Sequence, residues 1–302
     1  MFEQITSNKR RSVALVFAFV LVVVAVVWAF NTLIGYGVSG LVVAVVFAGG
    51  TAALAYWKSD AVALRMSHAK PADPEQYPRL HNVVEGLCIA AGLPKPRLYV
   101  IEDDAPNAFA TGRNPRHAAV AVTTGLLDRM NRIELEAVLA HELSHVKNYD
   151  ILVSTLAVTM VGVVVLLSDF GMRFMWFGGG RRRDNNGGGG GPGAMLALLG
   201  FALLILAPIA AKLMQFAISR RRETLADVSG VALTRYPPGL IAALEKLKED
   251  QTVVRSGSRA TAHLWIESPV ARKPEEGRLA WLGKMMDTHP PLDERIEALR
   301  EL

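Results

Sequence analysis

Cysteine is almost absent from this chain, which has a single one, Cys88, among 302 residues. One cysteine cannot form an intramolecular disulfide, so the sequence excludes a disulfide-rich fold. Cys88 lies in the apolar pattern Val83-Val84-Leu87-Cys88-Ile89, where a free cysteine typically serves as a small core residue.

A phosphate-binding loop is also missing. The nearest approach, Gly277 to Lys284, has five residues between its glycines where the motif needs four, and Met285 stands where Ser or Thr is required. We therefore expect no ATP-driven step. The net charge of +5 does not indicate nucleic-acid binding, because the basic residues cluster beside apolar runs, as they do in membrane proteins.

Charge is absent from two long stretches near the amino terminus, residues 12–30 and 38–57. Each approaches the roughly twenty apolar residues that cross a bilayer as a helix, so both are predicted to be transmembrane. Basic residues precede the first run at 9–11 and follow the second at Lys58 and Arg65, whereas the connecting segment is uncharged. This asymmetry predicts an amino terminus in the cytoplasm, with the bilayer as a partner.

Two further apolar runs, residues 151–168 and 194–211, lie at the short end of the spanning range. Two interpretations stay open: both cross the bilayer, or both only dip into it. The Gly- and Arg-rich loop 178–193 between them is expected to be a mobile linker. Its basic residues disfavour the outer side, where a spanning hairpin would place it.

The segment 71–150 has the pattern of an α+β fold. Periodicity predicts a helix at 77–92, a strand at 97–102, strands at 107–111 and 117–123 joined by a turn, and a helix from 131. The strand at 107–111 has two interpretations of equal standing. It is an exposed edge strand to which a peptide pairs through main-chain hydrogen bonds, or it is an ordinary hairpin arm.

The strongest chemical signal is the HExxH motif His141-Glu142-Leu143-Ser144-His145. On a helix the two histidines lie one turn apart on the same face, close enough to bind one Zn²⁺. Glu142 is then placed to act as a general base. The alternative is a surface helix that carries an ordinary His-Glu-His face.

A catalytic zinc needs a third protein ligand. Glu223 and Asp227 follow the last apolar run four residues apart, so they share a helical face, with Glu223 as a metal ligand and Asp227 as the support of a ligand histidine. The alternative is that Glu223 pairs with the adjacent arginines and Asp227 is solvated. Because each half of the predicted site adjoins one end of the second apolar pair, we expect HExxH on a water-exposed helix at the cytoplasmic membrane surface.

Together these features resemble the HtpX family of membrane zinc metalloproteases, within the wider group that includes the CAAX prenyl endopeptidases. The resemblance rests on the two amino-terminal apolar runs and on four motifs, which are Asn107 to Gly112, His141 to Asp150, Glu223 to Asp227, and Thr288-His289-Pro290-Pro291 with Arg295-Ile296. It implies an α+β, zincin-like metalloprotease domain with four hydrophobic helices. It divides the chain into an amino-terminal transmembrane hairpin (1–58), the first part of a cytoplasmic protease domain (59–150), a hydrophobic hairpin (151–211) and the second part of the protease domain (212–302).

The resemblance also implies roles for individual residues. One Zn²⁺ per chain is bound by His141, His145 and Glu223, and Glu142 is the base. His289 and Arg295 approach the site and steady the oxyanion or gate the metal, although a histidine before Pro-Pro also needs no catalytic reason. The substrate-pairing strand comprises Asn107, Ala108, Phe109, Ala110 and Thr111, with Asn107 near the scissile peptide.

The implied function is ATP-independent hydrolysis of misfolded or damaged membrane proteins, as part of a stress response at the bacterial inner membrane. Substrates must offer extended or unfolded polypeptide. Three alternatives stay open. A non-catalytic zinc adaptor would not need Glu142. A site-2-type intramembrane protease fits poorly with the charged start of the motif helix. A CAAX-type endopeptidase fits poorly with a short chain that has only four candidate spans.

Overall fold

The computed structural model describes residues 2–34, 37–160, 220–250, 252–255, 261, 264–267 and 290–302. The expected linker 178–193, the apolar run 194–211, residues 161–168 and His289 lie outside these ranges. In chain order the elements are α1 (Phe2–Ile34), α2 (Gly37–Met66), β1 (Lys70–Pro71), α3 (Pro78–Ala91), β2 (Arg97–Ile101), β3 (Ala108–Gly112), the 3-10 turn η1 (Pro115–His117), β4 (Ala118–Thr123), α4 (Thr124–Arg129), α5 (Arg132–Lys147), α8 (Arg220–Thr234), α9 (Pro237–Glu249) and α11 (Leu292–Arg300).

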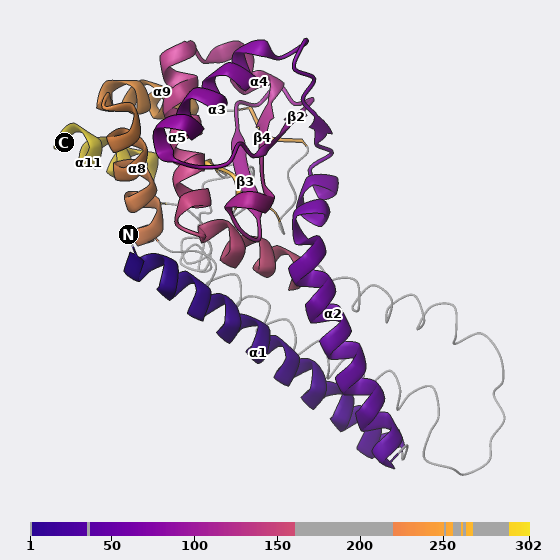
Figure 1. Cartoon of the computed structure of the whole chain (residues 1–302). Helices are drawn as coiled ribbons and strands as arrows, with labels where there is room; N and C mark the ends of the chain where they lie inside the picture. The colour runs from indigo at the N-terminus through magenta and orange to yellow at the C-terminus, as the bar shows by residue number, and fades with distance from the viewer. Residues whose placement is uncertain are drawn as a thin grey trace, which may run out of the picture.

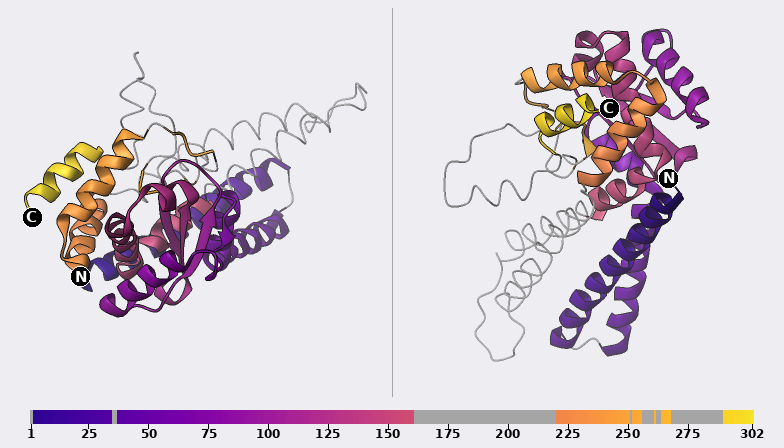
Figure 2. Two further views of the ribbon diagram at one scale, coloured as in Figure 1. Left: turned by 90° about the horizontal axis from the view of Figure 1, so that it is seen from above. Right: turned by 90° about the vertical axis from the view of Figure 1, so that its left-hand side faces the viewer.

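Helices α1 and α2 form a long hairpin that projects from the rest of the molecule (Figures 1 and 2). They contain the two apolar runs expected to be transmembrane. Within the described residues, no helix satisfies both the length and the apolar character needed to cross a membrane. The two runs are therefore confirmed as helical, and their crossing of a bilayer stays a prediction.

A four-stranded sheet forms the centre of the body, in the order β1-β2-β4-β3. Strand β4 pairs in parallel with β2 and antiparallel with β3, while β1 adds a short antiparallel pair to β2. The predicted strands at 97–102, 107–111 and 117–123 are confirmed within a residue or two. Strand β3 thus lies at one edge of the described sheet, where it contacts α5, the helix that carries HExxH (Figure 1).

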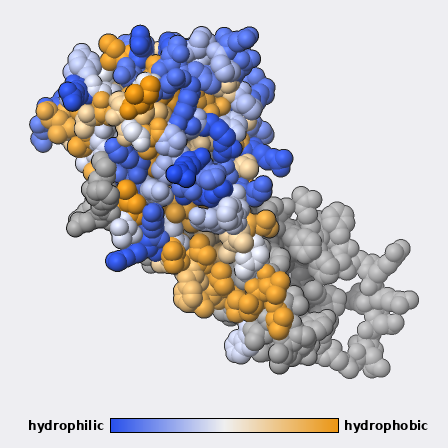
Figure 3. All heavy atoms as spheres, viewed as in Figure 1, coloured by the Kyte–Doolittle hydropathy of each residue, from blue (hydrophilic) through white to orange (hydrophobic). Residues whose placement is uncertain are grey.

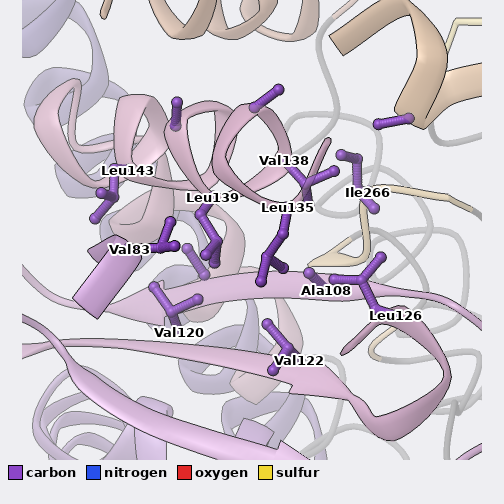
Figure 4. Packing of buried hydrophobic residues seen from close by; sticks show 14 of the residues in the cluster. Val83, Ala108, Val120, Val122, Leu126, Leu135, Val138, Leu139, Leu143 and Ile266 are labelled. Atoms are coloured by element: carbon purple, nitrogen blue, oxygen red, sulfur yellow. The ribbon is translucent and has the colours of Figure 1, made fainter. Parts of the chain in front are cut away.

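Both faces of the sheet are covered, which explains why every residue of β4 is buried. Successive side chains of a strand point to opposite faces. Val120 and Val122 accordingly pack under α5, against Leu135 and Leu139 (Figure 4). The alternate residues Ala119 and Ala121 belong to a second cluster on the other face, formed with the end of α2 and with Trp265.

Local signals define the helix ends next to the site. Helix α3 ends at Gly92, whose left-handed backbone (φ 67°) allows the amide of Leu93 to bond the carbonyl of Cys88 at 2.9 Å. Helix α5 begins with a capping box. Asn131 accepts from the amide of Glu134 at 3.0 Å, and the Glu134 carboxylate accepts from the amide of Asn131 at 2.8 Å.

Candidate metal centre

The HExxH residues lie in the last two turns of α5, at the centre of the body. The helix is packed between α3, α8, α9 and β3, so it is buried on nearly all sides and has no single apolar stripe. His141 and Glu142 are each only 1 % exposed. The expectation of a water-exposed motif helix is therefore wrong, because α5 is fully exposed only in its first turn, at Arg132 and Ile133, and His145 of the motif is only partly exposed.

The two histidines face each other across one helical turn. Their Nε2 atoms are 3.2 Å apart, and the rings stand nearly perpendicular, with centroids 4.8 Å apart. The Nδ1 atoms point the other way, each to a carboxylate. His141 Nδ1 lies 2.8 Å from Asp227 Oδ1, and His145 Nδ1 lies 3.1 Å from Asp150 Oδ2. A proton held on Nδ1 in this way leaves the Nε2 lone pairs directed at a common point.

Glu223 closes the triangle from α8. Its carboxylate oxygens lie 3.7 Å from His141 Nε2 and 3.7 Å from His145 Nε2. The three ligand atoms all fall within 4.8 Å of one another. A tetrahedral zinc ion with bonds of about 2 Å keeps its ligand atoms roughly 3.3 Å apart. The separations here, with two imidazoles and one carboxylate as donors, fit a zinc ion with an open fourth position.

The predicted common face of Glu223 and Asp227 is present. Both are buried against α5, together with Ala226 and Gly230, while Thr224 and Val228 face solvent. The four-residue spacing lets one side chain reach the metal position and the other the back of a ligand histidine.

Arg295 of α11 approaches the centre from behind this pair. Its guanidinium donates two hydrogen bonds to Asp227, from Nε at 2.8 Å and from Nη2 at 2.6 Å, and Nη2 lies 3.5 Å from His141 Nδ1. It also donates to the carbonyl of Ile266 at 3.3 Å. The structure thus places Arg295 on the support of a ligand histidine, and not beside Glu142, which lines a different cavity.

The charges of this cluster are mutually stabilising. Burial lowers the pKa of His141, but the adjacent Asp227 carboxylate and a hydrogen bond with Glu223 more than offset this and raise the pKa to about 9. Burial raises the pKa of Asp227, but Arg295 and His141 outweigh it, so the pKa of this carboxyl is lowered. Because zinc binds a neutral imidazole, the raised pKa of His141 favours the proton over the metal, so zinc affinity is expected to fall as the pH is lowered.

A small cavity adjoins the three ligand residues, with a volume of about 30 Å³, the space of one water molecule. Glu142 lines it together with Ala110 of β3 and with the segment Leu264–Ile266. Glu142 is therefore placed beside the metal position and next to the edge strand.

Strand β3 lies at the edge of the sheet but is not exposed. Residues 107–111 are all nearly inaccessible, because the segment 264–267 lies along the outer edge of the strand. Ile266 N donates to Ala108 O at 2.9 Å, and the Asn107 side chain bonds both main-chain groups of Glu267, at 2.8 and 3.3 Å. Strand β3 is therefore one arm of the β3–β4 hairpin, as the second interpretation has it, and it lies at the sheet edge without being exposed; its pairing with a substrate stays a prediction.

Gly230 allows α8 to approach α5 closely enough to deliver Glu223. A Cβ atom added there would lie 3.0 Å from the backbone nitrogen and 3.2 Å from the Cα of His141. An alanine at a helix interior normally gains about 1 kcal/mol over glycine. We expect Gly230→Ala to cost about 1–3 kcal/mol instead, since the two backbones must separate.

Gly86→Ala is the matched control, because Gly86 is an exposed helical glycine with nothing within 4 Å of the added Cβ. Thermal unfolding should show stabilisation for Gly86→Ala and destabilisation with weakened zinc binding for Gly230→Ala. Equal stabilisation of both variants would contradict the close approach at His141.

Two features of the centre received no role from the sequence. Asp150 is the last residue of the motif His141 to Asp150, but the motif assigned it no function, and the structure shows that it supports His145 as Asp227 supports His141. The segment 264–267 carries no signal of its own, and only the three-dimensional arrangement places it at the site.

Comparison with known proteins agrees with this geometry. The model of peptidase family M48 matches residues 74–302. A "Protease HtpX homolog" of Caldanaerobacter subterraneus is 42 % identical over 306 residues, covering 100 % of this chain and 98 % of the relative. One of Streptococcus mutans is 45 % identical over 309 residues, covering 100 % of each.

Among solved structures, Ste24p of S. mikatae aligns at 19 % identity with a TM-score of 0.49, over 99 % of this chain and 66 % of that one. This likeness is too distant to support a further argument. The resemblance found in the motifs is nevertheless confirmed by the family match and by the full-length relatives. The chain belongs to peptidase family M48, as a metalloprotease of the HtpX type.

Proposed function

We propose that this protein is a zinc-dependent endopeptidase that hydrolyses extended or unfolded polypeptide without ATP. The observation that carries the proposal is the arrangement of His141, His145 and Glu223 around one point beside Glu142. When bound, zinc would polarise the scissile carbonyl and acidify water at the open position. Retention of Glu142 favours an enzyme over the zinc adaptor.

Glu142 performs the proton transfers. It accepts a proton from the water whose oxygen attacks the scissile carbonyl, and it delivers that proton to the amide nitrogen as the C–N bond breaks. The products are a carboxylate and an amine. Asp227 and Asp150 hold the two histidines in the orientation that keeps both Nε2 atoms free for the metal.

Strand β3 is the proposed substrate site, with Asn107 beside the scissile peptide. The segment 264–267 supports this role, because it is held on β3 by an isolated antiparallel bridge between Phe109 and Trp265, by the bond from Ile266 N to Ala108 O and by the Asn107 amide. Main-chain pairing with β3 would not depend on the side chains of the substrate, which agrees with a protease that cleaves unfolded segments of varied sequence. His289, whose implied role lies in oxyanion stabilisation or gating, stands outside the described residues; Arg295 is proposed to support Asp227.

The substrate class has a direct test. Zinc-loaded protein, purified in detergent without ATP, should cleave unfolded casein, spare a tightly folded protein, lose activity to a chelator and regain it with Zn²⁺. Activity that survives removal of the metal, or that requires ATP, would contradict the proposed function.

We further propose that the α1–α2 hairpin enters the bacterial inner membrane, with the amino terminus and the metal centre on the cytoplasmic side. Large apolar side chains on the hairpin face outward, among them Val13 (69 % exposed), Phe17 (63 %) and Val46 (68 %). In Figure 3 hydrophobic residues cover the visible face of the hairpin, whereas the visible face of the body mixes hydrophilic and hydrophobic residues. Misfolded or damaged membrane proteins would then be substrates within reach, in a quality-control role under stress.

Cysteine labelling tests this orientation with little background. The native Cys88 is buried, and burial raises the pKa of its thiol to about 11, so it reacts poorly. A membrane-impermeant thiol reagent should label Ser7→Cys in inverted vesicles only, and Thr32→Cys in right-side-out vesicles only. The reverse pattern would invert the proposed topology.

A further inference from the structure

The first helix touches the metal centre through a buried asparagine. Asn8 of α1 is 3 % exposed, although it lies only eight residues from the amino terminus. Its amide nitrogen donates to Asp150 Oδ1 at 2.6 Å and to the carbonyl of Asn148 at 2.8 Å. Both partners are acceptors, so both amide hydrogens are used and the orientation of the amide is defined.

Asp150 passes this contact on to a ligand histidine. One of its oxygens accepts from Asn8, and the other lies 3.1 Å from His145 Nδ1. The chain of contacts therefore runs from α1 through Asp150 to the imidazole whose Nε2 faces the metal position. The same arrangement supports the other histidine, where Arg295 bonds Asp227 and Asp227 bonds His141. On the His145 side, the amide of Asn8 takes the place of the Arg295 guanidinium.

The turn after α5 makes the contact possible. Asn148 is buried and Tyr149 adopts a left-handed backbone (φ 60°), which returns the chain so that Asp150 opens the next helical run beside His145. Lys9 of α1 lies over the Tyr149 ring, with its Nζ 4.5 Å from the centroid. In Figures 1 and 2 the start of α1 lies beside α8 in every view. The buried Arg222 of α8 is attracted by the carboxylate of Asp150 and repelled by Arg11 of α1.

We propose that Asn8 and Asp150 are positioning residues of the metal centre, so that α1 completes the support of His145. Neither is one of the three ligand residues. Asp150 orients the imidazole, and Asn8 fixes the carboxylate that does so. Zinc affinity consequently depends on whether α1 is docked against the turn at 148–150. The inference rests on the metal centre proposed above.

Zinc affinity of the full-length protein in detergent, measured by chelator competition, tests the proposal. Loss of a histidine's supporting partner weakens metal binding on the order of tenfold or more. Asp150→Asn is expected to show a loss of this order, and Asn8→Ala a loss of about threefold to tenfold. In Co²⁺-substituted protein, both should also shift the visible absorption of the metal.

A double-mutant cycle separates positioning from general loosening of the fold. If Asn8 acts through Asp150, Asn8→Ala should weaken zinc binding little further once Asp150→Asn is present. Ser12→Ala removes only a hydrogen bond within α1, from Ser12 Oγ to Asn8 O at 2.9 Å, and should bind zinc as the wild type does. Asn82→Ala repeats the substitution at an exposed asparagine of α3 and should also be silent.

Three results would overturn the proposal. In the first, Asn8→Ala keeps the zinc affinity and the Co²⁺ spectrum of the wild type. In the second, Asn8→Ala lowers zinc affinity as much in the Asp150→Asn background as in the wild type, and in the third Ser12→Ala lowers zinc affinity as much as Asn8→Ala does. If the wild-type protein does not bind zinc, the proposed metal centre itself is wrong. If the wild type binds zinc and Asn8→Ala binds it equally well, only the proposed role of α1 is wrong.

Discussion

Glu142→Gln is expected to lower kcat/KM for unfolded casein by about a thousandfold while leaving zinc content unchanged. General acid–base catalysis contributes roughly 10²–10⁴-fold. The amide has the shape of the carboxylate but cannot accept the proton. Glu142 lines the cavity beside the metal position, whereas the ligand triangle is made by His141, His145 and Glu223.

Glu136→Gln is the control for this variant, since it makes the same substitution six residues earlier on α5, at a partly exposed position. It should keep wild-type kcat/KM. Equal activity of Glu142→Gln and wild type at equal zinc content would show that Glu142 is not the base.

Glu223→Ala should release the metal. It leaves two imidazoles as protein ligands, fewer than the three that a catalytic zinc site requires. It also removes a negative charge that lies 3.7 Å from each imidazole and favours the cation. We expect zinc affinity to fall by more than about a hundredfold, beyond the loss typical of supporting residues, with peptidase activity lost in parallel.

Chelator competition measures this loss directly, and Glu297→Ala provides the control, because it removes an exposed glutamate of α11 with the same change in net charge. Zinc retention at the wild-type level in Glu223→Ala would reassign the third ligand to another residue.

The metal ligands were predictable from the sequence because their geometry is local. His141 and His145, and likewise Glu223 and Asp227, are four residues apart on a helix, so helical periodicity alone places each pair on one face. The order of the motifs then identified the family. The strands were predictable for a similar reason, since alternation and turn residues act over a few positions.

The supports of the site were not predictable, because they join distant parts of the chain. Asn8 is separated from Asp150 by 142 positions and lies outside any motif. The burial of α5 was missed because its first turn is charged, and the charged Glu134 is in fact buried in a capping box and paired with Lys246 at 2.7 Å. Strand β3 is buried because the segment 264–267 lies along it, with Trp265 paired to Phe109, and no local sequence pattern indicates this pairing.

The long sequence separations around the histidines also bear on when the protein becomes active. Asn8 enters near the start of the chain and Arg295 near its end, and the latter bonds Asp227 across 68 positions. Synthesis proceeds from the amino terminus, and contacts between distant segments form late in folding. A partly made chain holds both histidines but lacks the clamp on His141 until α11 has emerged. We therefore expect a chain that lacks α11 to bind zinc on the order of tenfold more weakly than the chain that carries it.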